Sequence, residues 1–163
     1  MSAATEFVLV SHWHVPAGRE RVWQVLRNTR DWPAWWRYVA SVDEVERGDA
    51  SGVGALHRYR WTSRLPYALT LTTRTVEVRE GEYIRARAEG DLDGEGIWQL
   101  SDEGNGTLVT YTWRVALTKR WMRSLAPLLR PLFTWNHNAV MAAGEAGMNA
   151  WLARGGVSEG APA

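Results

Sequence analysis

Two segments with strand-like alternation carry polar side chains that could act on a carbonyl compound. His57, Tyr59 and Arg60 lie close together in one segment, and Tyr111 lies in another. If they converge, these donors could stabilise an enolate oxygen, the charge that develops in aldol chemistry. Arg60 also alternates with apolar residues, and a solvent-facing side chain explains that pattern more simply. The sequence marks no acid and base pair, so it leaves the catalytic residues unknown.

The histidines do not form a recognisable metal site. His12 and His14 share one face of a predicted strand, and an i, i+2 pair can bind a metal, but zinc needs three or four ligands with supporting carboxylates. No further ligand is marked, so we expect no metal. His137 lies beside a stripe of apolar residues on the helix predicted for 131–154. For His137 we favour a hydrogen-bonded structural role over that of a base in a pocket.

Asn136 is the one polar residue inside that apolar stripe. A buried amide without a partner costs about 1–3 kcal/mol, so Asn136 requires one. Two interpretations stay open. Asn136 bonds a backbone group across the helix interface, or it presents its amide to a ligand.

Other catalytic patterns are missing. Gly52-Val53-Gly54 and Gly94-Glu95-Gly96 lack the third glycine of a dinucleotide fingerprint, and there is no Gly-x-Ser-x-Gly elbow. We therefore expect no cofactor. The unusual feature is instead tryptophan, with 11 Trp against 5 Tyr and 2 Phe. Several must fill the core, and the excess favours a cavity walled by flat side chains.

Period-two alternation and turn residues predict seven strands. The strongest hairpin signal is Asn105-Gly106, and 90–94 is a second clear turn. The expected strands are 5–15, 39 to the turn at 48–52, 53–63, 68–79, 82–89, a sixth from Gly94, and 107–117.

Helical spacing predicts a short helix over 19–28 and another around 33–38, with Asp31 as its N-cap. A helix over 119–126 is followed by Pro127 and Pro131, which interrupt it, and a long helix runs over 131–154. Its apolar stripe comprises Leu125, Leu128, Leu129, Leu132, Asn136, Ala139, Val140, Ala143 and Gly147. Six consecutive strands make an antiparallel meander, and only the long helix can cover its apolar face. This is an α+β architecture.

The length of 163 residues fits one domain over 1–154, with a disordered tail at 155–163. There is no cysteine, no signal-peptide pattern and no apolar run of about 20 residues, so we expect a cytoplasmic protein without stable membrane insertion. The net charge is +1 and the arginines are scattered, so we expect no nucleic-acid partner. A homodimer stays open.

This order of elements, with several motifs, resembles the helix-grip domain of the START and Bet v 1-like (SRPBCC) superfamily, in its bacterial polyketide cyclase/dehydrase and lipid-transport branch. The resemblance covers about residues 5–153. It is carried by Pro16-Ala17, Val22-Trp23, 31–36 (DWPAWW), Leu65-Pro66-Tyr67, 90–98 (GDLDGEGIW), Gly106-Thr107 and 135–138 (WNHN). It implies a helix-grip fold, in which a seven-stranded curved antiparallel sheet surrounds the long C-terminal helix and two short helices follow the first strand.

The resemblance also implies a pocket between the concave sheet and the long helix, of about 300–1,000 Å³. Carried onto this sequence, the expected ligand-binding residues are Tyr59, Trp61, Trp98, Tyr111 and Trp113 from the strands, His57 beside them, Asn136 and Val140 from the helix, and Trp35 and Trp36 at the entrance.

Three functions fit these expectations. The first is binding or transport of a hydrophobic small molecule such as a lipid, quinone or polyketide. The second is a cyclase, aromatase or dehydratase acting on a poly-β-ketone chain. The third is an interaction module whose cavity is collapsed and filled by its own tryptophans. The lack of a clear acid and base pair favours binding over catalysis.

Overall fold

The computed structural model describes residues 6–117 and 123–156. Residues 118–122 and 157–163, which include most of the predicted tail and part of the predicted 119–126 helix, lie outside the described residues. The elements are β1 (Glu6–Val15), α1 (Arg19–Arg27), the 3-10 turn η1 (Thr29–Asp31), α2 (Trp32–Trp35), β2 (Val39–Glu46), β3 (Leu56–Trp61), β4 (Leu69–Arg79), β5 (Tyr83–Gly90), β6 (Asp93–Glu103), β7 (Gly106–Ala116) and α4 (Ala126–Ala153).

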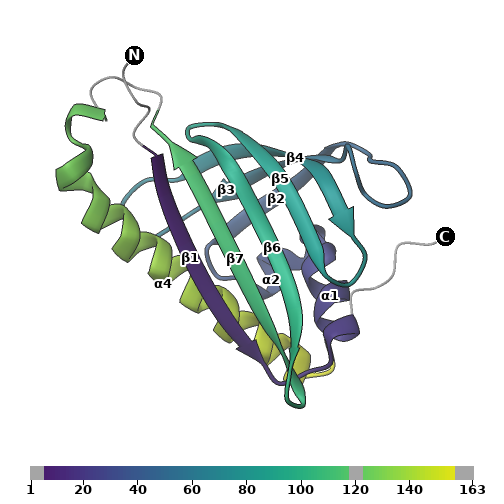
Figure 1. Ribbon diagram of the computed structural model, residues 1–163. Coiled ribbons are helices and arrows are strands. Elements are labelled where there is room, and N and C mark those ends of the chain that lie inside the picture. Colours follow the sequence, from purple (N-terminus) through teal and green to yellow (C-terminus); the bar gives the residue numbers. More distant parts are fainter. Residues whose placement is uncertain (1–5, 118–122, 157–163) are drawn as a thin grey trace.

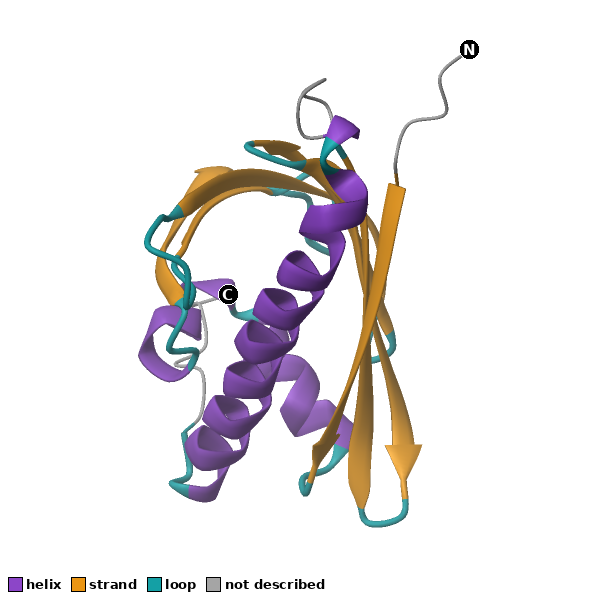
Figure 2. Cartoon of the chain, turned by 90° about the vertical axis from the view of Figure 1, so that its left-hand side faces the viewer, coloured by secondary structure: helices purple, strands orange, loops and turns teal. Residues whose placement is uncertain are grey.

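The seven strands form one antiparallel sheet in the order β1-β7-β6-β5-β4-β3-β2. Strands β2 to β7 follow one another as hairpins, and β1 pairs with β7 along its whole length. Register shifts interrupt the β2–β3 and β4–β5 ladders, and such irregularities bend a sheet. The sheet curls around α4 (Figure 1, Figure 2). The predicted helix-grip fold is confirmed.

Helix α4 begins earlier than the sequence predicts. It has 28 residues, starts at Ala126, holds Pro127 in its first turn and continues through Pro131. A proline in the first turn removes a donor that has no partner anyway. Pro131 deprives only the carbonyl of Pro127 of a donor, and Pro127 is exposed to water. The prediction that these prolines interrupt the helix is therefore wrong.

Asp31 occupies the predicted N-cap position of α2 but does not cap the helix with its side chain. Thr29–Asp31 forms a 3-10 turn that leads directly into α2, and Asp31 makes no side-chain cap bond. Its carboxylate instead accepts a hydrogen bond of 2.8 Å from the amide of Asn28.

The C-terminal half of α4 packs against a cluster of tryptophans. The rings of Trp13 and Trp36 lie 5.1 Å apart, and those of Trp13 and Trp98 lie 5.3 Å apart. Gly144 allows this close approach, because a Cβ at that position would lie 2.6 Å from both Trp13 and Trp36. The buried residues of α4 are Ala126, Met141, Gly144, Met148 and Leu152.

The first half of α4 is less covered than the predicted stripe requires. Leu125, Leu128 and Leu132 are 45%, 74% and 41% exposed. Leu125 and Leu128 are not among the residues that line the cavity, whereas Leu129 and Leu132 line it. Across the described residues, no helix is long and apolar enough to cross a membrane.

Candidate functional site

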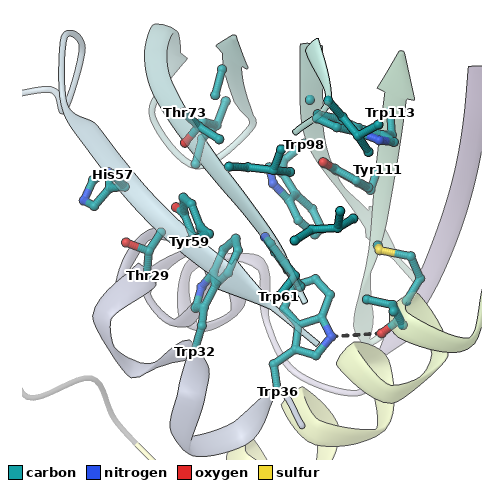
Figure 3. A pocket seen from close by; sticks show the side chains of 18 of the residues that line it. Thr29, Trp32, Trp36, His57, Tyr59, Trp61, Thr73, Trp98, Tyr111 and Trp113 are labelled. Carbon is teal, nitrogen blue, oxygen red and sulfur yellow. Dashed lines mark hydrogen bonds between the residues drawn. The ribbon is translucent and has the colours of Figure 1, made fainter. Parts of the chain in front are cut away.

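A cavity of about 1520 Å³ lies between α4 and the concave face of the sheet. It is larger than the predicted range of about 300–1,000 Å³. The apolar and aromatic side chains of its wall come mainly from β3, β4, β6 and β7 and from α4 (Figure 3). The interior is therefore not solidly packed.

Two aromatic ladders line the cavity (Figure 3). Alternate residues of a strand share a face, so β3 directs His57, Tyr59 and Trp61 inward. The rings of Tyr59 and Trp61 are stacked, with centroids 6.1 Å apart and planes at 21°. On β7 the rings of Tyr111 and Trp113 are stacked in the same way, 6.4 Å apart at 15°. The sheet thus presents flat surfaces to the cavity from two strands.

Trp98 joins the second ladder from the neighbouring strand β6. Its ring lies 4.1 Å from that of Tyr111. Gly96, two residues earlier, leaves the room that Tyr111 occupies, since a Cβ there would lie 2.8 Å from the Tyr111 hydroxyl. The sequence motif Gly94-Glu95-Gly96 is therefore a packing feature of the cavity wall.

Trp35 and Trp36 do not guard the entrance as predicted. They are 5% and 1% exposed, so both lie inside the protein. Trp36 lines the cavity and donates a hydrogen bond of 2.9 Å from Nε1 to the carbonyl of Val140, as Figure 3 shows. Trp35 is not among the lining residues. Its ring is stacked on that of Trp36, with centroids 5.5 Å apart.

Trp32, Thr29 and Thr73 line the cavity, and the sequence reasoning missed them. The ring of Trp32 lies 5.6 Å from that of Tyr59. Thr29 and Thr73 form hydrogen bonds with the Tyr59 hydroxyl, but burial outweighs them and raises the pKa of Tyr59 to about 12. Trp32 could have been found from its place in the 31–36 motif, whereas the threonines carry no signal in the sequence.

His57 lies near charged residues at the edge of the cavity. Its Nε2 is 3.8 Å from the carboxylate of Glu44, which is itself paired with Arg30 at 2.9 Å. Burial lowers the pKa of His57, Glu44 opposes this shift, and Arg30 adds to it. At neutral pH the imidazole is therefore neutral and able to accept a proton.

His137 lines the cavity from α4. Its ring is stacked with that of Tyr111 at 6.3 Å, and its Nε2 lies 3.4 Å from the hydroxyl of Ser11. Burial lowers the pKa of His137 to about 4, so it is neutral at pH 7. The hydrogen bond agrees with the structural role that the sequence favoured, and the residue faces the cavity as well.

Asn136 and Val140 also line the cavity from α4. The Oδ1 atom of Asn136 is buried and has no hydrogen-bond partner within the described part of the chain. A half-turn about χ2 exchanges the positions of Oδ1 and Nδ2, so the amide can present either atom to a molecule in the cavity. Across the cavity, burial raises the pKa of the Tyr111 hydroxyl, which stays protonated and can donate.

The other histidines lie away from the cavity. His14 pairs with Glu103 at 2.7 Å and His12 contacts Thr110 at 3.2 Å, both at the surface. Among the residues that the structure describes, no group of three or more potential ligands could hold a metal ion. The cavity wall is thus mainly aromatic and apolar, and charged residues, among them Arg30, Glu44 and Asp91, also line it.

The sequence was compared with models of known protein families. Residues 7–148 match the family model described as polyketide cyclase / dehydrase and lipid transport. The chain belongs to this family. A comparison with curated protein sequences found no match.

Solved structures share the fold of this family member. TTHA0849 from Thermus thermophilus is 22% identical, with a TM-score of 0.73 over 88% of this chain and 98% of that one. The Zhui aromatase/cyclase from Streptomyces sp. R1128 is 16% identical, with a TM-score of 0.69 over 93% and 99%. Ara h 8.0201 is 10% identical, with a TM-score of 0.58 over 89% and 99%. At these identities the likeness concerns the fold alone.

Proposed function

We propose that this protein binds a flat, hydrophobic small molecule that carries at least one oxygen, in the cavity between α4 and the sheet. The observation that carries the proposal is the cavity of about 1520 Å³ with aromatic ladders on β3 and β7. Stacked rings favour other flat π-systems, and each such contact is worth about 0.5–1.5 kcal/mol beyond the area it buries. A polycyclic polyketide or quinone fits this wall better than a branched aliphatic chain.

The oxygen follows from the polar groups of the cavity. The Asn136 amide has a buried oxygen without a partner among the described residues, and the Tyr111 hydroxyl is held protonated by burial. An unpaired buried amide is costly, so a ligand group that completes its hydrogen bonds gains affinity. A hydroxyl or carbonyl on the ligand can do so, whereas a hydrocarbon cannot.

The size of the cavity argues against an interaction module. Such a module would have its cavity filled by its own tryptophans, and here Trp32, Trp36 and Trp98 form a wall around empty volume. The proposal is therefore a binding protein or carrier.

Native mass spectrometry of freshly purified protein tests the proposal. We expect a species heavier than the 18.4 kDa chain. On collisional activation this species should lose a small apolar molecule. Addition of hydroxypyrene, a flat four-ring phenol, should quench tryptophan emission by energy transfer, because several tryptophans line the cavity. Protein that carries no small molecule and shows no quenching would exclude this function.

Cyclisation of a poly-β-ketone chain is a second candidate. It is favoured by the neutral imidazole of His57, which lines the same cavity as the protonated hydroxyl of Tyr111. The imidazole could take a proton from a carbon between two carbonyl groups while the hydroxyl donates to the enolate oxygen. The Zhui protein, whose fold is similar, is an aromatase/cyclase.

A soluble poly-β-ketone thioester mimic tests this second candidate. We expect cyclisation above the spontaneous rate, and a fall of at least about a hundredfold in His57→Gln, as for loss of a general base. Tyr111→Phe should slow the reaction with little change in binding. Equal rates with and without protein would leave binding as the function.

A further inference from the structure

A row of polar side chains crosses three neighbouring strands on the cavity side of the sheet. Glu44 on β2 lies directly opposite His57 on β3, and His57 lies directly opposite Thr73 on β4. Paired residues share a face of the sheet and have Cβ atoms about 4.5–5.5 Å apart. All three line the cavity, and we call them the polar row. Figure 3 shows His57 and Thr73 on one side of the cavity and Tyr111 on the other.

His57 is the member of the polar row whose hydrogen-bonding capacity the protein leaves unused. The carboxylate of Glu44 accepts a hydrogen bond of 2.9 Å from Arg30. The hydroxyl of Thr73 bonds that of Tyr59. The His57 side chain is only 14% exposed, and its Nε2 lies 3.8 Å from the Glu44 carboxylate, too far for a hydrogen bond. Within the described part of the chain the imidazole makes no hydrogen bond, so a molecule in the cavity can supply one.

The surroundings of His57 decide what kind of group it can bind. Burial lowers the pKa of the ring, which is therefore neutral at pH 7 and has one donor and one acceptor nitrogen. The negative charge of Glu44 favours the tautomer with its proton on Nε2, the nitrogen that faces the carboxylate. The other nitrogen, Nδ1, then carries a lone pair and needs a hydrogen-bond donor.

A neutral hydroxyl group is the donor that fits this position. A ligand carboxylate has no proton to donate at neutral pH, and the carboxylate of Glu44 would repel it. A ligand ammonium would meet the guanidinium groups of Arg30 and Arg47, which lie 2.9 and 3.9 Å from Glu44 and also line the cavity. A hydroxyl avoids both conflicts, because it donates without carrying a charge.

The polar row lies far along the sheet from the polar groups on which the proposed function rests. Tyr111 is on β7, and three strands separate β7 from β3. At about 4.8 Å per strand the path along the sheet is about 19 Å, and the curvature of the sheet brings the two walls closer. The ring of Trp32 lies 5.6 Å from that of Tyr59 and 6.0 Å from that of Trp98, so aromatic surface continues between the walls. A flat ligand that reaches both walls has oxygen atoms near its two ends.

We infer that His57 accepts a hydrogen bond from a hydroxyl group at one end of the ligand, and that this bond fixes which way round the ligand lies. The inference rests on the proposed function and deepens it. The ligand class becomes a flat molecule with a hydroxyl group toward β3 and a second oxygen toward Tyr111 and Asn136. Acids and amines of the same shape are disfavoured.

Binding of stilbene derivatives tests the inference. The probes are trans-stilbene, dihydroxystilbene with one para hydroxyl on each ring, its dimethyl ether, which accepts but cannot donate, and the matching dicarboxylate. Quenching of tryptophan emission gives the dissociation constants. We expect His57→Phe to weaken binding of dihydroxystilbene about three- to tenfold, the effect of one hydrogen bond, and not to weaken binding of stilbene or the ether. His57→Gln should recover most of the loss, because its amide oxygen can accept.

His12→Phe is the matched control, since His12 lies at the surface beside Thr110, and it should bind every probe as the wild type does. In the double variant His57→Phe, Asn136→Leu the two losses should multiply, because the residues hold separate ends of the ligand. A double variant no weaker than either single one contradicts this orientation. Wild-type protein that binds none of the probes overturns the proposed function as well as this inference. Saturable binding of stilbene, with His57→Phe weakening no probe or all probes alike, overturns only the inference, as does a dicarboxylate that binds the wild type more tightly than dihydroxystilbene.

Discussion

The indole of Trp36 donates a hydrogen bond of 2.9 Å to the backbone carbonyl of Val140. This bond joins the segment after α2 to the middle of α4, and both residues line the cavity. The Trp36 ring also meets Trp61 edge-on, with centroids 5.0 Å apart. One side chain therefore connects the helix, the short helical segment and the sheet around the cavity.

Trp36→Phe should lower the free energy of unfolding by about 1–3 kcal/mol, because it removes the bond to Val140 and part of a buried ring. Chemical denaturation measures the change. Trp135→Phe is the control at a 47% exposed position and should change stability by less than about 0.5 kcal/mol. Equal effects of the two substitutions would contradict this role for Trp36.

Gly147→Ala should be more disruptive than an ordinary helix substitution. A Cβ at Gly147 would overlap the backbone carbonyl of Trp35, which cannot rotate away. Overpacking of this kind costs about 1–3 kcal/mol, and it outweighs the gain in helix propensity of about 1 kcal/mol. Thermal unfolding of Gly147→Ala beside Gly18→Ala, where nothing lies within 4 Å of the added Cβ, checks the comparison. A stabilised Gly147→Ala would mean that α4 packs differently.

Much of the fold could be predicted from the sequence because its signals are local. The alternation of Val109, Tyr111, Trp113 and Val115 sets one face of β7, and Asn105-Gly106 sets the turn before it. Once the register of two strand pairs is known, antiparallel pairing sets the register of the neighbouring strands. The side chains that β3, β6 and β7 direct toward the cavity therefore follow from the alternation in each strand.

The errors concern features that depend on tertiary packing. A proline such as Pro131 predicts a helix break from sequence rules alone, yet in the structure it is only the sixth residue of α4. Leu128 fits an apolar stripe by spacing, but in the structure it is 74% exposed and does not line the cavity. Trp35 and Trp36 are adjacent and cannot be told apart by composition, although only Trp36 reaches the cavity.

The stability of the protein should depend on pH through His137. Its pKa falls from the ordinary 6.5 to about 4 on folding. As pH drops through this window the unfolded chain takes up a proton and the folded chain does not, so the unfolding free energy decreases by about 3 kcal/mol in total. The contribution is fully present above pH 6.5.

Denaturation at several pH values, with His137→Gln as the comparison, measures this effect. The difference in unfolding free energy between wild type and variant should shrink as pH falls from about 6.5 to about 4. A constant difference would show that His137 titrates normally. The pH titration of the His137 ring proton shifts, followed by NMR, measures its pKa directly.

Asn136→Leu should separate its two interpretations. Because Oδ1 lacks a partner in the described residues, we expect stability to hold or rise. Binding of hydroxypyrene should weaken about three- to tenfold, and binding of pyrene should not. A stability loss of about 1–3 kcal/mol would instead mean that Asn136 bonds the protein itself.

The central claim is that the cavity between α4 and the sheet is the binding site. Ala86 lines it from β5, and we expect a larger side chain at this position to fill part of the cavity. The decisive measurement is the dissociation constant of hydroxypyrene for wild type and Ala86→Phe, by quenching of tryptophan emission. We predict saturable binding that weakens at least about tenfold in Ala86→Phe while thermal stability is kept. Equal affinities, or no saturable binding to the wild type, would contradict the claim.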